Sequence, residues 1–226
     1  MKKTFLLSCL MLAAMPVMAA YTGRVYVDKN KNGVFDPGEK TWAGIKVSDG
    51  LNVVETAADG SFTLPGHERE RFIFITTPSG YKTFNRHYHK IEKKQSGYDF
   101  GLIPYSGRIR KDGSHRYIHI TDTEIFNTEN HADWVNNVRD YARNEQAAFI
   151  IHTGDICYEK GLKAHIKLMN TENMDCPVFY CIGNHDLVKG KYGEELFESI
   201  YGPVYYSFDA GNVHYIVTPM PGGDHA

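Results

Sequence analysis

The sequence has little net charge, few cysteines and no long apolar run beyond its first twenty residues. Its 25 Lys and Arg against 27 Asp and Glu give a formal net charge of −2. Nucleic acids and anionic membranes select basic surfaces, so we expect neither as a partner. A spanning helix needs roughly 20 consecutive apolar residues, and no later segment reaches that length, so we expect no transmembrane segment.

The first 19 residues have the pattern of a removable export signal. A basic start at residues 1–3 precedes an uncharged apolar run at residues 4–15, and the small residue Ala19 suits cleavage by signal peptidase. We therefore expect the protein to be exported, to the periplasm or the extracellular space.

The cysteines do not predict a disulfide framework. Cys9 lies in the leader, and the three that remain are an odd number. Cys176 and Cys181 bracket a predicted strand at an offset of five, which places them on opposite faces. We expect Cys157, Cys176 and Cys181 to be reduced and buried.

Residues 20–104 predict a small all-β sandwich. Short apolar stretches alternate with turn signals such as Asp49-Gly50 and Asp59-Gly60, and no helical period is present. The expected strands cover residues 23–27, 44–47, 52–56, 61–64 and 71–75. Residues 105–114, rich in Ser, Gly and basic groups, predict a linker.

Residues 115–226 predict an α/β domain. Strands at 117–122, 147–155 and 176–182 alternate with helices at 131–146 and 158–173, an order typical of a parallel sheet. Residues 205–208 and 213–217 then predict a hairpin.

Polar groups stand at the C-terminal end of each of the three predicted parallel strands. They are Asp122-Thr123-Glu124, Gly154-Asp155 and Gly183-Asn184-His185-Asp186. Ligands of open α/β sheets bind outside the carboxyl ends of the strands, so we expect these groups to converge. Oxygen donors with imidazole and no thiolate favour Mn, Fe or Zn.

A structural explanation competes with this interpretation. A single Asp at a strand end is usually a helix cap or a turn former. Three consecutive strand ends with the same character favour a functional site. Histidines within apolar strands are more often structural, and among them His152, three residues before Asp155, is the best candidate for a supporting role.

The order of these motifs resembles that of the calcineurin-like metallophosphoesterases. The resemblance implies a dinuclear metal centre in which Asp122 binds the first ion, Asp155 bridges both and Asn184 binds the second. It further implies that His185 lies beside the leaving group and that Asp186 orients its imidazole. The implied activity is hydrolysis of a small phosphate mono- or diester by a water that two divalent metal ions activate.

The sequence departs from this family in two places. The first motif carries Glu124 where the family has histidine, and we expect Glu124 to supply an oxygen ligand instead. The family also places further histidines downstream, whereas the printed sequence ends at Ala226. We therefore expect residues 115–226 to be the N-terminal portion of a truncated catalytic domain with impaired activity.

A second metal signal lies at residues 28–39, which we call the calcium-type loop. It has the twelve-residue spacing of a calcium site, with a glycine at the sixth position. Strands flank it, so it is similar to the loops of β-sandwich modules such as the B-type modules of bacterial adhesins. A similar sandwich precedes the catalytic domain in some bacterial calcineurin-like proteins. The alternative is a polar turn without metal. The expected ligands are Asp28, Asn30, Asn32, Val34, Asp36 and Glu39.

Two functions remain open at this point. One is an exported metal-dependent phosphoesterase, and the other is a catalytically silent binding or adhesion protein with a calcium-stabilised sandwich. Hydrolysis of a chromogenic phosphate ester distinguishes them. The sequence indicates neither a specific substrate nor an oligomeric state.

Overall fold

The computed structural model describes residues 20–95, 97–188 and 192–219. The predicted export signal at residues 1–19 lies outside this range. Within the described residues, no helix combines the length and the apolar character that crossing a bilayer requires.

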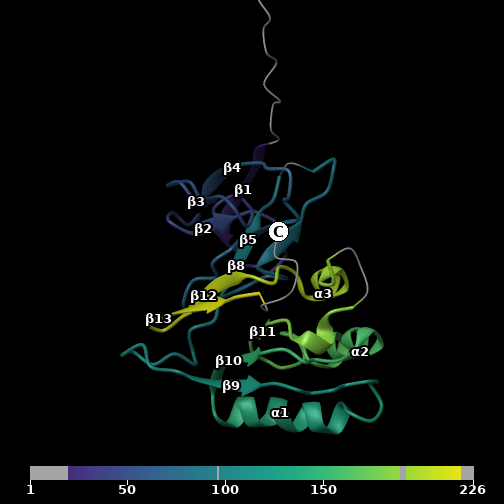
Figure 1. Cartoon of the computed structure of the whole chain (residues 1–226). Helices are drawn as coiled ribbons and strands as arrows, with labels where there is room; N and C mark the ends of the chain where they lie inside the picture. The colour runs from purple at the N-terminus through teal and green to yellow at the C-terminus, as the bar shows by residue number, and fades with distance from the viewer. Residues whose placement is uncertain (1–19, 96, 189–191, 220–226) are drawn as a thin grey trace, which may run out of the picture.

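The N-terminal region is a β-sandwich, as predicted, with more strands than the sequence pattern indicated (Figure 1). Its two four-stranded sheets enclose a core that includes Val47, Leu64 and Ile73. One sheet has the order β4-β1-β8-β6, with β4 (Ser61–Pro65), β1 (Ala20–Val27), β8 (Phe100–Pro104) and β6 (Tyr81–Thr83). The other has the order β3-β2-β5-β7, with β3 (Val53–Glu55), β2 (Lys46–Ser48), β5 (Phe72–Ile75) and β7 (Tyr88–Lys90).

Strand β5 is buried on both faces because it joins two cores. Ile73 and Ile75 face the sandwich core, whereas Phe72 and Phe74 pack into a second cluster with residues of the C-terminal region. Burying a side chain of this size contributes roughly 1.5–3 kcal/mol. The sandwich is therefore packed against the C-terminal region by an apolar face.

The C-terminal region is the predicted α/β unit, with a parallel three-stranded sheet in the order β11-β10-β9. Its elements are β9 (Arg116–Ile120), α1 (Ala132–Asn144), β10 (Ala147–His152), α2 (Glu159–Leu168), β11 (Val178–Tyr180), the 3₁₀ turn η1 (Asn184–Asp186), α3 (Glu195–Tyr201), β12 (Tyr206–Ala210) and β13 (Val213–Val217). Strands β12 and β13 form the predicted antiparallel hairpin. Helix α3 was not predicted, because seven residues are too few for a clear helical period.

Helix α1 forms where predicted, and Val138 packs partly buried against the same core as its buried residues. Val135 and Ala142 are its buried residues, whereas the side chains of Trp134 and Tyr141 are exposed. The packed side of the helix therefore runs through Val135, Val138 and Ala142. Cys157 and Cys176 are buried, Cys181 is half-buried, and all three are free thiols, in line with the expectation that they do not pair.

The β12–β13 hairpin lies between the sandwich and the parallel sheet (Figure 1). Phe208 of β12 stacks on Phe179 of β11 with ring centroids 3.6 Å apart. On its other side, the Asp209 amide donates to the Thr77 carbonyl of the sandwich region at 2.9 Å. Arg71 also forms an ion pair with the buried Glu198 of α3 at 2.9 Å. These contacts hold the two regions together.

Candidate metal centre

The polar groups at the three strand ends converge, as the parallel sheet requires. We call Asp122, Glu124, Asp155, Asn184, His185 and Asp186 the strand-end site. The Asp122 amide donates to the Gly154 carbonyl at 3.2 Å, and the His185 amide donates to Asp155 Oδ1 at 3.1 Å. The chain segments after β9, β10 and β11 are therefore in direct contact.

Glycine is required at both positions where these segments meet, for two different reasons. Gly154 has a φ of +98°, a left-handed conformation that glycine adopts without strain. Gly183 is extended, but a Cβ there would lie 2.1 Å from the Asp155 amide nitrogen and 2.3 Å from its Oδ1. Gly183 thus permits the close approach of the two segments without a left-handed turn.

Three carboxylate residues of the site stand on left-handed backbone. The φ angles are +54° at Asp122, +48° at Glu124 and +49° at Asp155. Such conformations cost of order 1–3 kcal/mol each and persist where surrounding contacts impose them. The same conformation occurs singly at Lys31, Gln146 and Asp175, so the strand-end site is distinguished by three such acidic residues in segments that lie close together.

Asp186 differs from its expected role. It is fully buried, and its carboxylate accepts hydrogen bonds from the amides of Ile156 at 2.8 Å, Cys157 at 3.0 Å and Gly183 at 2.8 Å. Burial raises the pKa of Asp186 to about 6. Its carboxylate joins the segment after β10 to the segment after β11, so it shapes the site through the backbone and does not orient the imidazole.

Glu124 makes the contact that was expected of Asp186. His185 Nδ1 lies 3.0 Å from Glu124 Oε1, and this hydrogen bond is the main cause that raises the pKa of His185. The aromatic ring of Tyr158 stacks on the imidazole at 4.9 Å with an interplanar angle of 20°. Sequence reasoning missed Tyr158, which carried no motif signal of its own.

A buried histidine, His152, is hydrogen-bonded to the segment that carries Asp122 and Glu124. His152 Nε2 lies 2.9 Å from Thr123 Oγ1, which donates in turn to the Ile156 carbonyl at 3.2 Å. His152 is fully buried, and burial lowers its pKa to about 4, so it is neutral at physiological pH. The contact links His152 to the segment after β9, and its supporting role in the site stays a prediction.

The donor set of the strand-end site fits divalent cations. Asp122, Asp155 and Asn184 offer carboxylate and amide oxygens, and Asp122 and Asn184 are exposed to incoming ligands. The close approach of Gly183 to Asp155 brings two of these segments into contact. Among the described residues, the carboxylates of Asp122, Glu124 and Asp155 do not all lie within 4.8 Å of one another, the distance that a second group of side chains meets. The structure thus establishes convergence of the backbone segments.

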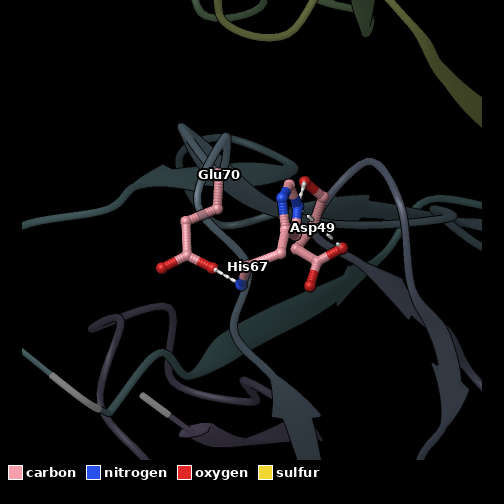
Figure 2. Close-up of side chains that lie close together, drawn as sticks. All are labelled: Asp49, His67 and Glu70. Carbon is pink, nitrogen blue, oxygen red and sulfur yellow. Dashed lines mark hydrogen bonds and ion pairs between the residues drawn. The ribbon is translucent and has the colours of Figure 1, made fainter. Parts of the chain in front are cut away.

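A different group, in the sandwich, could hold a metal ion (Figure 2). Ligand atoms of Asp49, His67 and Glu70 all lie within 4.8 Å of one another. Sequence reasoning missed this group because Asp49 comes from one turn and His67 and Glu70 from another, without a shared motif.

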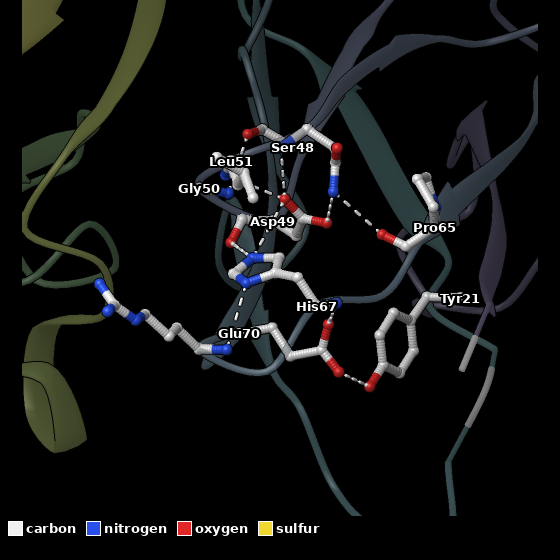
Figure 3. A network of polar contacts seen from close by, with 10 residues as sticks. Tyr21, Ser48, Asp49, Gly50, Leu51, Pro65, His67 and Glu70 are labelled. Atoms are coloured by element: carbon white, nitrogen blue, oxygen red, sulfur yellow. Dashed lines mark hydrogen bonds and ion pairs between the residues drawn. The ribbon is translucent and has the colours of Figure 1, made fainter. Parts of the chain in front are cut away.

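The oxygens of this group already accept hydrogen bonds (Figure 3). Asp49 Oδ1 accepts from the Asn52 amide at 2.7 Å, and Glu70 accepts from the Tyr21 hydroxyl and the His67 amide. His67 Nδ1 accepts from the Arg69 amide at 3.2 Å. We interpret the group as a network that fastens the turns at one edge of the sandwich.

The calcium-type loop is also closed by its own side chains. Asp28 is buried and accepts from the amides of Asn32 at 3.1 Å and Gly33 at 2.8 Å. Asp36 Oδ2 accepts from the side-chain amides of Asn30 at 2.7 Å and Asn32 at 2.8 Å. Glu39 reaches the Lys29 amide at 2.8 Å, so residues at both ends of the loop meet.

A cavity of about 610 Å³ lies away from the strand-end site. It is bounded by residues 81–89 of the sandwich region and by residues 166–180 around β11. The strand-end site is therefore identified by the polar residues that meet at the strand ends, and not by the size of a cavity.

Two family models match the chain. Residues 29–104 match the one described as the N terminal of Calcineurin-like phosphoesterase, and residues 115–223 match the one described as Calcineurin-like phosphoesterase. A search of curated proteins finds no match. Residues 105–114 lie between the two matches, and the first match identifies the sandwich as this family's own N-terminal domain. The chain therefore belongs to the calcineurin-like metallophosphoesterases, a family that uses divalent metal ions.

Proposed function

We propose that this protein is an exported enzyme that hydrolyses a small phosphate mono- or diester at the strand-end site. The observation that carries the proposal is the contact between Asp155 and the segment that holds Asn184 and His185, through the His185 amide at 3.1 Å. Export is supported by the pattern of residues 1–19.

Asp122, Asp155 and Asn184 would hold two divalent cations, with Mn, Fe or Zn favoured by the donor set. When bound, the cations supply neutralisation of phosphoryl charge and an activated water. The protein's own groups do the rest. The His185 amide fixes the Asp155 carboxylate, and Asp186 fixes the backbone of two of the converging segments.

His185 would protonate the leaving group. Its side chain is about one third exposed, so a substrate can reach it. Imidazole exchanges protons near neutral pH, and general acid catalysis of this kind contributes roughly 10²–10⁴-fold in rate. The negative charge that develops on the departing oxygen is thereby neutralised.

Hydrolysis of p-nitrophenyl phosphate and of bis-p-nitrophenyl phosphate, with and without Mn²⁺, tests this function. We expect turnover that depends on the metal and falls by about 10³-fold or more in Asp155→Ala, since that carboxylate lies at the centre of the converging segments. Asp59→Ala, at an exposed site in the sandwich, is the matched control. Turnover that is absent, or that survives in Asp155→Ala, would favour the silent binding protein.

A further inference from the structure

The imidazole of His185 is fixed by two side chains from other segments. Glu124 Oε1 contacts its Nδ1 at 3.0 Å, which sets the direction of that nitrogen. Tyr158 stacks on the ring at 4.9 Å, which sets its plane. With Nδ1 directed at a carboxylate, the nitrogen left to face a substrate is Nε2.

Asp186 cannot take over the role of Glu124. Both of its oxygens accept backbone hydrogen bonds, from Ile156 and Cys157 on one oxygen and from Gly183 on the other. The carboxylate is also buried beneath the turn, whereas the imidazole is partly exposed. The orientation of His185 therefore depends on a residue 61 positions away in the sequence.

Hydrogen bonds hold the backbone around Glu124 in the conformation in which its carboxylate contacts His185. Glu124 has a φ of +48°, and the neighbouring Thr123 is tied to the buried His152 and to the Ile156 carbonyl. Ile156 also donates to Asp186, so the segments that carry Glu124 and His185 are fastened to the same residue. The two side chains thus meet on segments that are hydrogen-bonded to the same residue, Ile156.

We propose that Glu124 is a positioning residue that holds His185, and that it does not complete the shell of a metal ion. The proposal rests on the proposed function of the strand-end site. The Glu124 carboxylate accepts from Nδ1–H, which fixes the ring so that Nε2–H faces the leaving group. When the P–O bond breaks, its electron pair stays on the leaving oxygen, which takes the proton from Nε2 and leaves a neutral imidazole.

Comparing substrates with good and poor leaving groups tests this role, because proton donation matters most for poor ones. In Glu124→Gln, we expect kcat to fall about tenfold more with phenyl phosphate than with p-nitrophenyl phosphate, with unchanged metal content per chain. Glu124→His, which offers the family's usual ligand, should not restore activity. Loss of bound metal, equal loss on both substrates or restoration by Glu124→His would overturn the proposal.

A double-mutant cycle gives an independent readout. If Glu124 acts through His185, adding Glu124→Gln to His185→Ala should cost no further activity. Additive losses would contradict this. The contact itself can be measured in the metal-free protein by ¹⁵N NMR of the His185 ring, where Glu124→Gln should shift Nδ1 and change the tautomer populations.

The two readouts separate the two proposals. A wild-type protein without metal-dependent turnover would refute the proposed function but would leave the NMR result to decide the Glu124–His185 contact. A ring resonance that is the same in wild type and Glu124→Gln would refute the positioning role whatever the activity.

Discussion

The calcium-type loop and the strand-end site are both rich in side-chain oxygens that could bind a metal ion. They differ in the backbone that carries these oxygens. In the loop, Asp28 and Glu39 accept hydrogen bonds from backbone amides of the same loop. At the strand ends, Asp122, Glu124 and Asp155 occupy left-handed backbone. In the loop, Lys31 is the one non-glycine residue with a left-handed φ and the carboxylates are held by the amides of the loop, whereas three carboxylate residues of the strand-end site have such a φ.

The junction of the two regions gives the largest expected change in stability. Arg71 pairs with the buried Glu198, which also accepts from the Tyr192 hydroxyl at 2.9 Å. Arg71→Ala leaves a buried carboxylate without its cation, and we expect a loss of about 3 kcal/mol in the free energy of unfolding. Urea denaturation measures it.

The exposed pair of Lys46 and Glu55 is the matched control for Arg71→Ala. Lys46→Ala should cost no more than about 0.5 kcal/mol, because surface ion pairs contribute little. Equal effects of the two variants would mean that the regions are not coupled through Arg71.

Acid should destabilise the protein through three histidines, of which His152 and His165 are fully buried and His87 is partly buried with an inaccessible Nε2. Burial lowers the pKa of His87 to about 3 and of His152 to about 4, and it lowers the pKa of His165 well below its usual value. Each folded pKa lies below the unfolded value near 6.5, so the unfolded chain takes up protons first. Their stabilising contribution is complete above pH 6.5 and is lost as pH falls toward the folded pKa, by ~1.4 kcal/mol per pH unit for each histidine.

Urea denaturation between pH 7 and 5 measures this slope. His87 lies on the sandwich side of the junction. In His87→Phe, the three histidines' contribution to the change of unfolding free energy with pH should fall by about one third. A slope that does not change in this variant would show that His87 is protonated in the folded protein.

The strain at the strand-end site predicts that removing it stabilises the protein. Asp122→Gly and Asp122→Ala both delete the carboxylate, but only glycine adopts the φ of +54° without cost. We expect Asp122→Gly to exceed Asp122→Ala in unfolding free energy by about 1 kcal/mol, with both variants deficient in metal-dependent turnover. Equal stabilities would remove the contrast with the calcium-type loop.

Calcium should have the smallest effect. We propose that the calcium-type loop binds Ca²⁺ through Asp28, Asn30, Asn32, the Val34 carbonyl, Asp36 and Glu39. Since the loop is already closed by internal hydrogen bonds, we expect calcium to raise the melting temperature by only a few degrees relative to chelator. A melting temperature that calcium leaves unmoved would favour a polar turn without metal.

Sequence patterns predicted the features that depend on local order. Alternating apolar residues predicted the sandwich, and the alternation of strands and helices predicted the parallel sheet. Because ligands of such sheets bind at the carboxyl ends of the strands, the segments with Asp122, Asp155 and Asn184 were expected to converge. The contact between Glu124 and His185 could not be predicted, because it joins residues 61 positions apart and depends on side-chain directions. The sequence also did not predict that both faces of β5 are buried. Phe72 and Phe74 could have belonged to the sandwich core, whereas they pack against the C-terminal region.

The manganese EPR spectrum of the protein tests most directly whether the strand-end site is a dinuclear centre. Two Mn²⁺ ions roughly 3.5–4 Å apart share exchange coupling, which distinguishes them from isolated ions. With calcium present to fill the loop in the sandwich, we expect a coupled signal from two ions per chain that disappears in Asp155→Ala. A spectrum of isolated Mn²⁺ that is the same in wild type and Asp155→Ala would contradict this account.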